Sequence, residues 1–172
     1  METSSSTRLP GSIFFFLVLL GAVRANLYAA HLPATMASHF GGDGRANGWQ
    51  SQTGFFTLDV AVTVLAAVIA FIVPRIMTVV PPSAINLPNR EFWFGPQQRE
   101  GTVAFFRAQF AWFGCALLAF LLVVNELVFR ANLTSPRQLS NTAFAAALVL
   151  FLAFSGFWTI RMILHFSRKP TG

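Results

Sequence analysis

Three ionisable side chains lie inside otherwise apolar stretches of the sequence, and they are the best candidates for chemistry. Arg24, Asp59 and Glu126 each fall toward one end of a long hydrophobic run. Because a charge in hydrocarbon is costly, such residues usually face the interior of a helix bundle and pair with each other. We therefore expect Arg24 to bridge Asp59 and Glu126 in a polar site that binds a ligand or moves protons. The alternative interpretation is a structural ion cluster whose long side chains reach the membrane surface.

A second group of polar residues lies between the first two hydrophobic runs. His39 and Asp43 are four positions apart and would share one face of a helix, an arrangement that zinc sites use. Neither a His-Glu-x-x-His motif nor a second cysteine accompanies them, since Cys115 is the only cysteine. The stretch from Asp43 to Asn47 lacks the closing glutamate of a calcium loop. We therefore predict no metal and no cofactor, with His39 and Asp43 as candidate binding residues.

Known catalytic motifs are missing from the sequence. It has no glycine-rich phosphate loop, no serine elbow and no pair of closely spaced carboxylates. Cys115 follows Gly114 in the middle of an apolar run, where small residues let helices approach closely. We predict that Cys115 has a packing role and that the protein is not an enzyme.

The composition indicates an integral membrane protein. Of the 172 residues, 55% are hydrophobic and 10% are charged, against roughly 25% charged in soluble domains. One small soluble domain would leave much of this apolar surface in water, and a disordered chain would be richer in charge. The net charge of +6 comes from basic residues at the ends of the apolar runs. We therefore expect the lipid bilayer, and not nucleic acid, as the partner of these charges.

Four apolar runs are long enough to cross a bilayer, which takes about 20 helical residues. They cover residues 11–30, 55–80, 103–129 and 142–166. The predicted fold is all-α: one membrane domain, residues 1–172, built as a four-helix bundle. The first run also resembles a signal peptide, but Arg24, Asn26 and Tyr28 continue its helical pattern, so we favour a retained helix.

The positive-inside rule predicts the orientation of these spans. With both termini in the cytoplasm, loop 81–102 is inner and loop 31–54 is outer. The inner side then holds eight basic residues and the outer side four. The inner residues are Arg8, Arg75, Arg90, Arg99, Arg107, Arg161, Arg168 and Lys169, and the outer residues are Arg24, Arg45, Arg130 and Arg137.

The outer loop 31–54 is expected to form an ordered cap. Loops of this length are usually either functional or disordered, and Leu32, Met36, Phe40 and Trp49 are apolar anchors that disordered segments lack. The anchors Leu32, Met36 and Phe40 recur every four residues, which predicts a short helix over residues 32–40 with Gly41-Gly42 ending it. His39 and Asp43 would then line a shallow polar recess.

Four short motifs in this loop carry a family resemblance. They are His31-Leu32-Pro33, Ala37-Ser38-His39-Phe40, Asp43-Gly44-Arg45 and Asn47-Gly48-Trp49. Together they resemble a bacterial domain of unknown function that occurs in short membrane proteins and at the front of Sdp-type immunity proteins. Those proteins protect a producer cell from its own toxin and relay a signal. The segment 85–100 is similar to one that accompanies the module. The resemblance implies a location in the bacterial cytoplasmic membrane.

Two functional hypotheses follow. In the first, the protein is a binding or accessory module, immunity-, signalling- or complex-subunit-like, whose outer loop with Trp49, Phe55 and Phe56 receives a peptide, a lipid or another membrane protein. In the second, it is a small transporter or membrane enzyme that uses Arg24, Asp59 and Glu126. We prefer the first. Binding residues under this hypothesis are Arg24, Asp59, Glu126, His39, Asp43 and Trp49.

Overall fold

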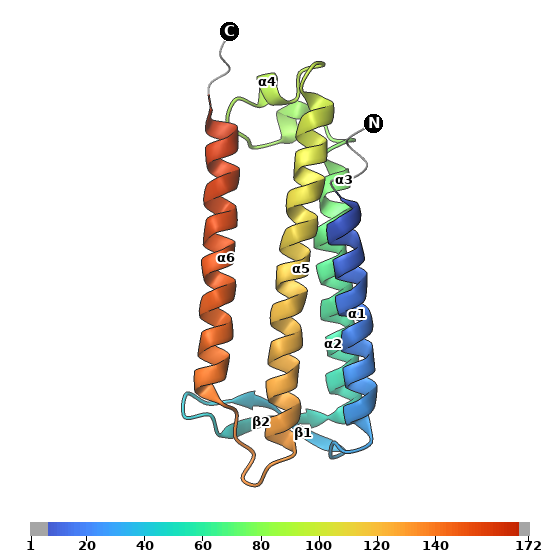
Figure 1. Ribbon diagram of the computed structural model, residues 1–172, viewed down its shortest axis with the longest axis vertical. Coiled ribbons are helices and arrows are strands. Elements are labelled where there is room, and N and C mark those ends of the chain that lie inside the picture. Colours follow the sequence, from blue (N-terminus) through green and yellow to red (C-terminus); the bar gives the residue numbers. More distant parts are fainter. Residues whose placement is uncertain (1–6, 169–172) are drawn as a thin grey trace.

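The computed structural model describes residues 7–168, and four long helices dominate it (Figure 1). They are α1 (Arg8–Ala29), α2 (Gln52–Ala67), α5 (Arg99–Asn132) and α6 (Asn141–Ser167). A π-helical turn, η2 (Val68–Ile72), and α3 (Val73–Ile76) extend α2 without a break. All four spans are long and apolar enough to cross a membrane, which confirms the four helices predicted from the sequence.

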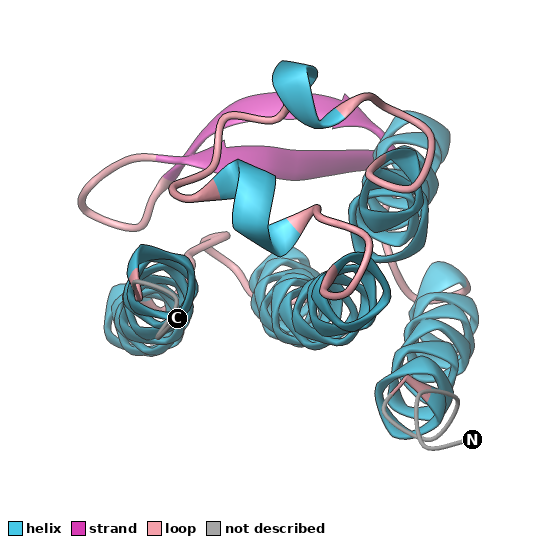
Figure 2. Cartoon of the chain, turned by 90° about the horizontal axis from the view of Figure 1, so that it is seen from above, coloured by secondary structure: helices cyan, strands magenta, loops and turns pink. Residues whose placement is uncertain are grey.

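The helices form an open arrangement around α5. In both views, α1 and α2 lie on one side of α5, whereas α6 stands on the other side (Figures 1 and 2). Aromatic side chains join α6 to α5: Phe113 and Phe120 of α5 contact Phe151 of α6. Trp158 also donates its indole N–H to the Gln109 carbonyl at 3.1 Å. The arrangement is therefore more open than a closed bundle. The remaining apolar faces of α6 are left for lipid to cover.

Pro74 explains the π-helical turn in the second span. Proline has no N–H to offer the carbonyl four residues earlier, and its ring crowds that carbonyl. Here the helix widens by one residue, so that the Val73 N–H bonds to Val68. The Arg75 guanidinium donates to the Phe71 carbonyl at 2.7 Å and satisfies it within the same turn. The span thus stays continuous through the irregularity.

Gly114 of α5 lies in close contact with the second span. A Cβ atom added there would lie 2.5 Å from the Cβ of Ala70. Phe14 of α1 packs against the same point, in a core cluster that includes Cys115 and Leu118. The Cys115 thiol is buried and donates to the Pro10 carbonyl at 3.2 Å. This confirms the packing role predicted for Cys115 and shows that the helices need glycine at position 114.

Two short elements complete the loop between α3 and α5. They are the 3₁₀ turn η3 (Pro82–Ala84) and α4 (Arg90–Trp93). The Asn89 amide and the Trp93 indole both donate to the Phe166 carbonyl near the end of α6, at 3.2 Å and 3.1 Å. Ile85 and Phe94 pack with Phe166 in a core cluster. This loop therefore fixes the end of α6.

The connection between α1 and α2 is a β-hairpin, which corrects the all-α prediction. Strands β1 (Thr35–Phe40) and β2 (Ala46–Ser51) pair antiparallel, with Met36 opposite Gln50. The tight turn between the strands uses Gly44 at a φ of 79°, a conformation that glycine adopts without strain. The predicted helix over residues 32–40 is wrong, because the backbone of Ala37 bonds sideways to the Asn132 side chain of α5. In a helix, the N–H and C=O groups of Ala37 would instead point along the helix axis.

Replacing Gly114 by alanine should destabilise the protein, because the new methyl group collides with Ala70. Overpacking of this kind typically costs about 1–3 kcal/mol. Gly156→Ala in α6 is the matched control, since no heavy atom lies within 4 Å of its added Cβ. Thermal unfolding in one detergent should show a lower Tm for Gly114→Ala and an equal or higher Tm for Gly156→Ala. Equal Tm values for both variants would contradict the close contact.

Candidate functional site

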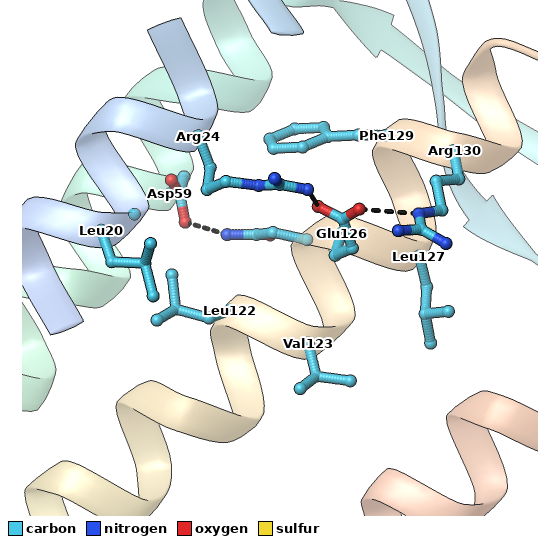
Figure 3. Close-up of a pocket in the computed structure, with 11 residues that line it drawn as sticks. Leu20, Arg24, Asp59, Leu122, Val123, Glu126, Leu127, Phe129 and Arg130 are labelled. Atoms are coloured by element: carbon cyan, nitrogen blue, oxygen red, sulfur yellow. Dashed lines mark hydrogen bonds and ion pairs between the residues drawn. The ribbon is translucent and has the colours of Figure 1, made fainter. Parts of the chain in front are cut away.

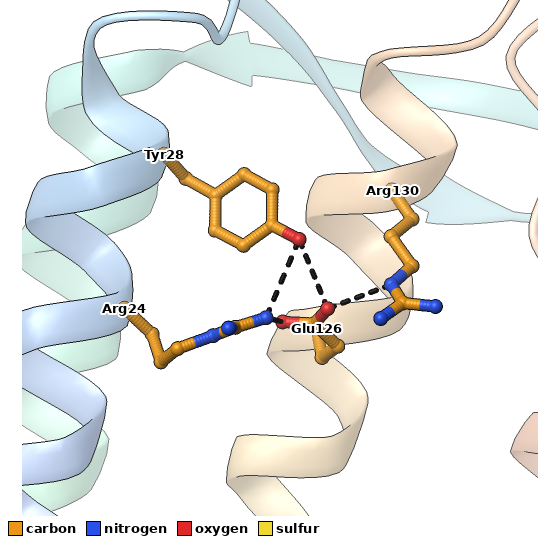
Figure 4. A network of polar contacts seen from close by, with 4 residues as sticks. All are labelled: Arg24, Tyr28, Glu126 and Arg130. Atoms are coloured by element: carbon orange, nitrogen blue, oxygen red, sulfur yellow. Dashed lines mark hydrogen bonds and ion pairs between the residues drawn. The ribbon is translucent and has the colours of Figure 1, made fainter.

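Glu126 is the centre of a polar network between α1 and α5 (Figure 4). One of its carboxylate oxygens pairs with the Arg24 guanidinium. The other accepts the Tyr28 hydroxyl at 2.9 Å and the Arg130 Nε–H at 2.6 Å. Three donors therefore surround this one carboxylate. The arrangement satisfies the group that would otherwise be costly inside the span.

Helix periodicity brings these four residues together. Arg24 and Tyr28 are one turn apart on α1, and Glu126 and Arg130 are one turn apart on α5, so each pair shares a helix face. Close packing of α1 on α5 also brings the two pairs within reach of each other. A Cβ atom added at Gly21 would lie only 2.8 Å from the Leu122 side chain. The sequence-based prediction that Arg24 reaches Asp59 or Glu126 is confirmed for Glu126.

Asp59 has a different partner from the one expected. One of its oxygens accepts the Asn125 amide of α5 at 2.6 Å. Within residues 7–168, neither Arg24 nor any other cation pairs with Asp59, and its second oxygen has no hydrogen-bond partner. Arg24 therefore does not bridge the two carboxylates. An amide partner leaves the acceptor capacity of Asp59 only partly used.

Two adjoining cavities open beside this network, and we call them together the cleft. The first has a volume of about 460 Å³ and is lined by Arg24, Asp59 and Glu126 together with apolar residues such as Leu20 and Leu122 (Figure 3). The second, of about 520 Å³, lies between α1, α2 and α5. Four residues line both: Gly21, Asp59, Leu122 and Asn125. The pair Asp59–Asn125 is thus the polar element common to both cavities.

The other predicted site residues lie in the hairpin, away from the cleft. His39 contacts the Asn47 side chain across the two strands. Asp43 accepts the Arg45 backbone N–H at 3.0 Å within the turn, so the shared helix face expected for His39 and Asp43 does not form. In the described part of the chain, no three histidine, cysteine or acidic side chains gather as metal ligands.

Most of the predicted apolar anchors hold the hairpin on the helices. Leu32 and Met36 are buried with Phe55 and Phe129 in one core cluster, and Phe40 packs against it. Trp49 instead keeps 52% of its surface exposed. The guanidinium of Arg137 stands 4.9 Å from the centre of its indole ring, a cation–π contact.

Three amide side chains hold the hairpin or the helix ends that flank it, and they were not identified from the sequence. Asn132 is buried, and its side chain bonds both the N–H and the C=O of Ala37, at 2.7 Å and 2.9 Å. Gln52 donates to the Ala29 carbonyl at 2.7 Å, and Asn141 donates to the Gly42 carbonyl at 2.7 Å. All three stand at the ends of predicted spans, which is the only signal that the sequence offers.

One comparison with known proteins gave a match. The profile of a domain of unknown function, DUF1648, matches residues 16–64. The matched segment carries Arg24, Tyr28, the hairpin and Asp59, but not Glu126 or Asn125. No curated protein and no solved structure matches the chain. The match supports the predicted module of unknown function at the front of the chain.

Removing the side chain that holds Ala37 should loosen the hairpin. We expect Asn132→Leu to raise the rate at which added protease cuts residues 35–51, because the buried backbone groups of Ala37 lose their partners. Trp49→Ala is the control: Trp49 is exposed, so its loss should change the rate little. If both variants and the wild type are cut as fast as an unfolded peptide, the hairpin is not an ordered cap.

Proposed function

We propose that this chain is a non-catalytic binding module of a bacterial cytoplasmic membrane, with both termini in the cytoplasm. Its cleft takes up the polar head of an amphiphilic ligand. The match to a domain of unknown function and the four apolar helices support a membrane protein. The cavities between α1, α2 and α5 support a ligand site within it.

The lining of the cleft favours an amphiphile over a wholly polar or wholly apolar ligand. Most lining residues are apolar, among them Leu17, Val18 and Leu121. The polar groups are concentrated on one stretch of α5 and the facing residues of α1 and α2. Ligand pockets commonly combine apolar walls with a few placed polar groups that orient the ligand.

The free oxygen of Asp59 is the observation that carries the proposal. The two arginines of the polar network, Arg24 and Arg130, both pair with Glu126 and not with Asp59. Asp59 contacts a neutral amide and faces both cavities. A carboxylate at this depth favours a cation or a hydrogen-bond donor. The ligand head that fits is therefore an ammonium group or a hydroxyl group, with its apolar tail between α1 and α2.

The hairpin would serve this site as a fixed roof. Asn132 of α5 and Asn141 at the start of α6 bond the hairpin backbone, and Gln52 joins the start of α2 to the end of α1, between which the hairpin lies. Its exposed side presents Trp49 stacked with Arg137. An accessory role, in which a peptide or another membrane protein docks on this exposed side, fits the same arrangement, since tryptophan and arginine are enriched at interaction hot spots.

Asp59→Asn should abolish the preference of the cleft for amines. Dodecylamine should raise the Tm of the wild-type protein in nanodiscs more than dodecanoate does, since a ligand that binds only the folded state stabilises it. In Asp59→Asn, the apparent affinity for the amine should fall roughly tenfold or more, as expected for loss of a charged hydrogen bond. Asp43→Asn is the control, because Asp43 lies in the exposed hairpin turn. If amine and carboxylate stabilise all three proteins equally, Asp59 does not select the ligand.

The orientation is tested by cysteine labelling. In a Cys115→Ala background, single cysteines replace Asp43, Gln98 and Ser135, all of which are exposed. A membrane-impermeant maleimide added to intact cells should label positions 43 and 135 and leave position 98 unlabelled until the cells are opened. Labelling of position 98 alone in intact cells would reverse the orientation.

A further inference from the structure

A third cavity, of about 360 Å³, lies between α5 and α6 at the end of the molecule away from the hairpin. Its lining residues divide into two kinds. Three are basic or imidazole side chains at the end of α6: Arg161 and His165 within the helix, and Arg168 directly after it. The others are apolar, with Phe105 from α5 and Phe157, Ile160 and Leu164 from α6. No aspartate or glutamate lines it.

The two arginines of this cavity have no anionic partner in the part of the chain that the structure describes. Arg161 and His165 are one helix turn apart on α6, so they share a helix face. Arg168 is the extended residue that follows the helix, and it lines the same cavity. Within residues 7–168, the side chain of neither arginine makes a hydrogen bond or an ion pair. Both arginines carry a positive charge beside the same cavity, so an anion bound there would be stabilised by both.

Apolar surface continues from the basic side chains toward the middle of the span. Phe157 lies one turn before Arg161 and is 64% exposed, and Ile160 and Leu164 are more than half exposed. An anion that also carries hydrocarbon chains would meet the arginines with its head and these side chains with its tails. The charge and the adjoining apolar face are complementary to a lipid, whereas a small free anion would use only the arginines.

The end of α6 is held in place before any ligand arrives. The His165 ring stacks on Phe105 with ring centres 3.9 Å apart and planes at 9°. The Phe166 carbonyl accepts hydrogen bonds from Trp93 and Asn89 at 3.1 Å and 3.2 Å. A terminal helix turn without such partners would fray. Here the three polar side chains stand on a fixed backbone, which lowers the cost of ordering them when a ligand binds.

We propose that this cavity binds the phosphate head of an anionic phospholipid, with Arg161 and Arg168 as the charged contacts and His165 as a hydrogen-bond donor. The acyl chains then lie along Phe157, Ile160 and Leu164. The site is separate from the cleft, so this proposal stands whether or not the cleft binds an amphiphile.

Native mass spectrometry of the full-length protein tests the proposal. Phosphatidylglycerol and phosphatidylcholine with identical acyl chains are added separately to protein in mild detergent, and bound lipid is counted. The wild type should retain phosphatidylglycerol in preference. Arg161→Gln and Arg168→Gln should each weaken that binding roughly fivefold, since each arginine near an anionic lipid contributes about that factor. Arg161→Lys, which keeps the charge, should stay within about twofold.

Arg45→Gln is the matched control, because it removes one positive charge from the exposed hairpin turn at the opposite end. It should leave lipid binding unchanged. A Tm equal to that of the wild type in lipid-free detergent shows that a variant is folded. Inorganic phosphate and glycerol phosphate should not displace the lipid at equal concentration. Equal retention of the two lipids, an equal loss in Arg45→Gln, or full displacement by inorganic phosphate would overturn the proposal.

Discussion

A carboxylate placed inside a membrane-spanning helix must be given partners, and in this chain Glu126 has three. Arg24 and Tyr28 approach it from α1, and Arg130 approaches it from its own helix. This requirement fixes how α1 lies along α5. With Arg24 opposite Glu126, Gly21 falls against Leu122, and further along the same two helices Pro10 falls beside Cys115. The polar network and the close apolar packing therefore define one helix register.

The same network leaves Asp59 without a cation among residues 7–168. Both Asp59 and Glu126 line the same cavity, yet one is surrounded by three donors and the other accepts from a single amide. The difference matters because a satisfied carboxylate contributes to stability, whereas a partly satisfied one can still accept a donor from a ligand. Glu126 thus joins two helices, whereas under the proposed function Asp59 is the acid that receives the ligand head.

The sequence predicts the parts that depend on composition and on a small number of choices. Four spans follow from long apolar runs, and Arg24 near Glu126 follows because few acids occur at that depth. The hairpin was missed because a spacing of four, as in Leu32, Met36 and Phe40, fits the helix period and the strand period alike. The deciding contact comes from Asn132, 95 positions after Ala37. No local pattern in a single sequence can reveal such a partner, and the same holds for Asn125 and Asp59.

A double-mutant cycle on Arg24 and Glu126 tests the central claim that this pair sets the packing of α1 on α5. Thermal unfolding of the wild type, Arg24→Gln, Glu126→Gln and the double variant is measured in one detergent. A second cycle on Arg130 and Glu126, which pair within α5, is measured for comparison. Because the two side chains contact each other, we expect the double variant to lose clearly less stability than the sum of the two single variants. Losses that simply add would show that the two residues act independently and would contradict the account.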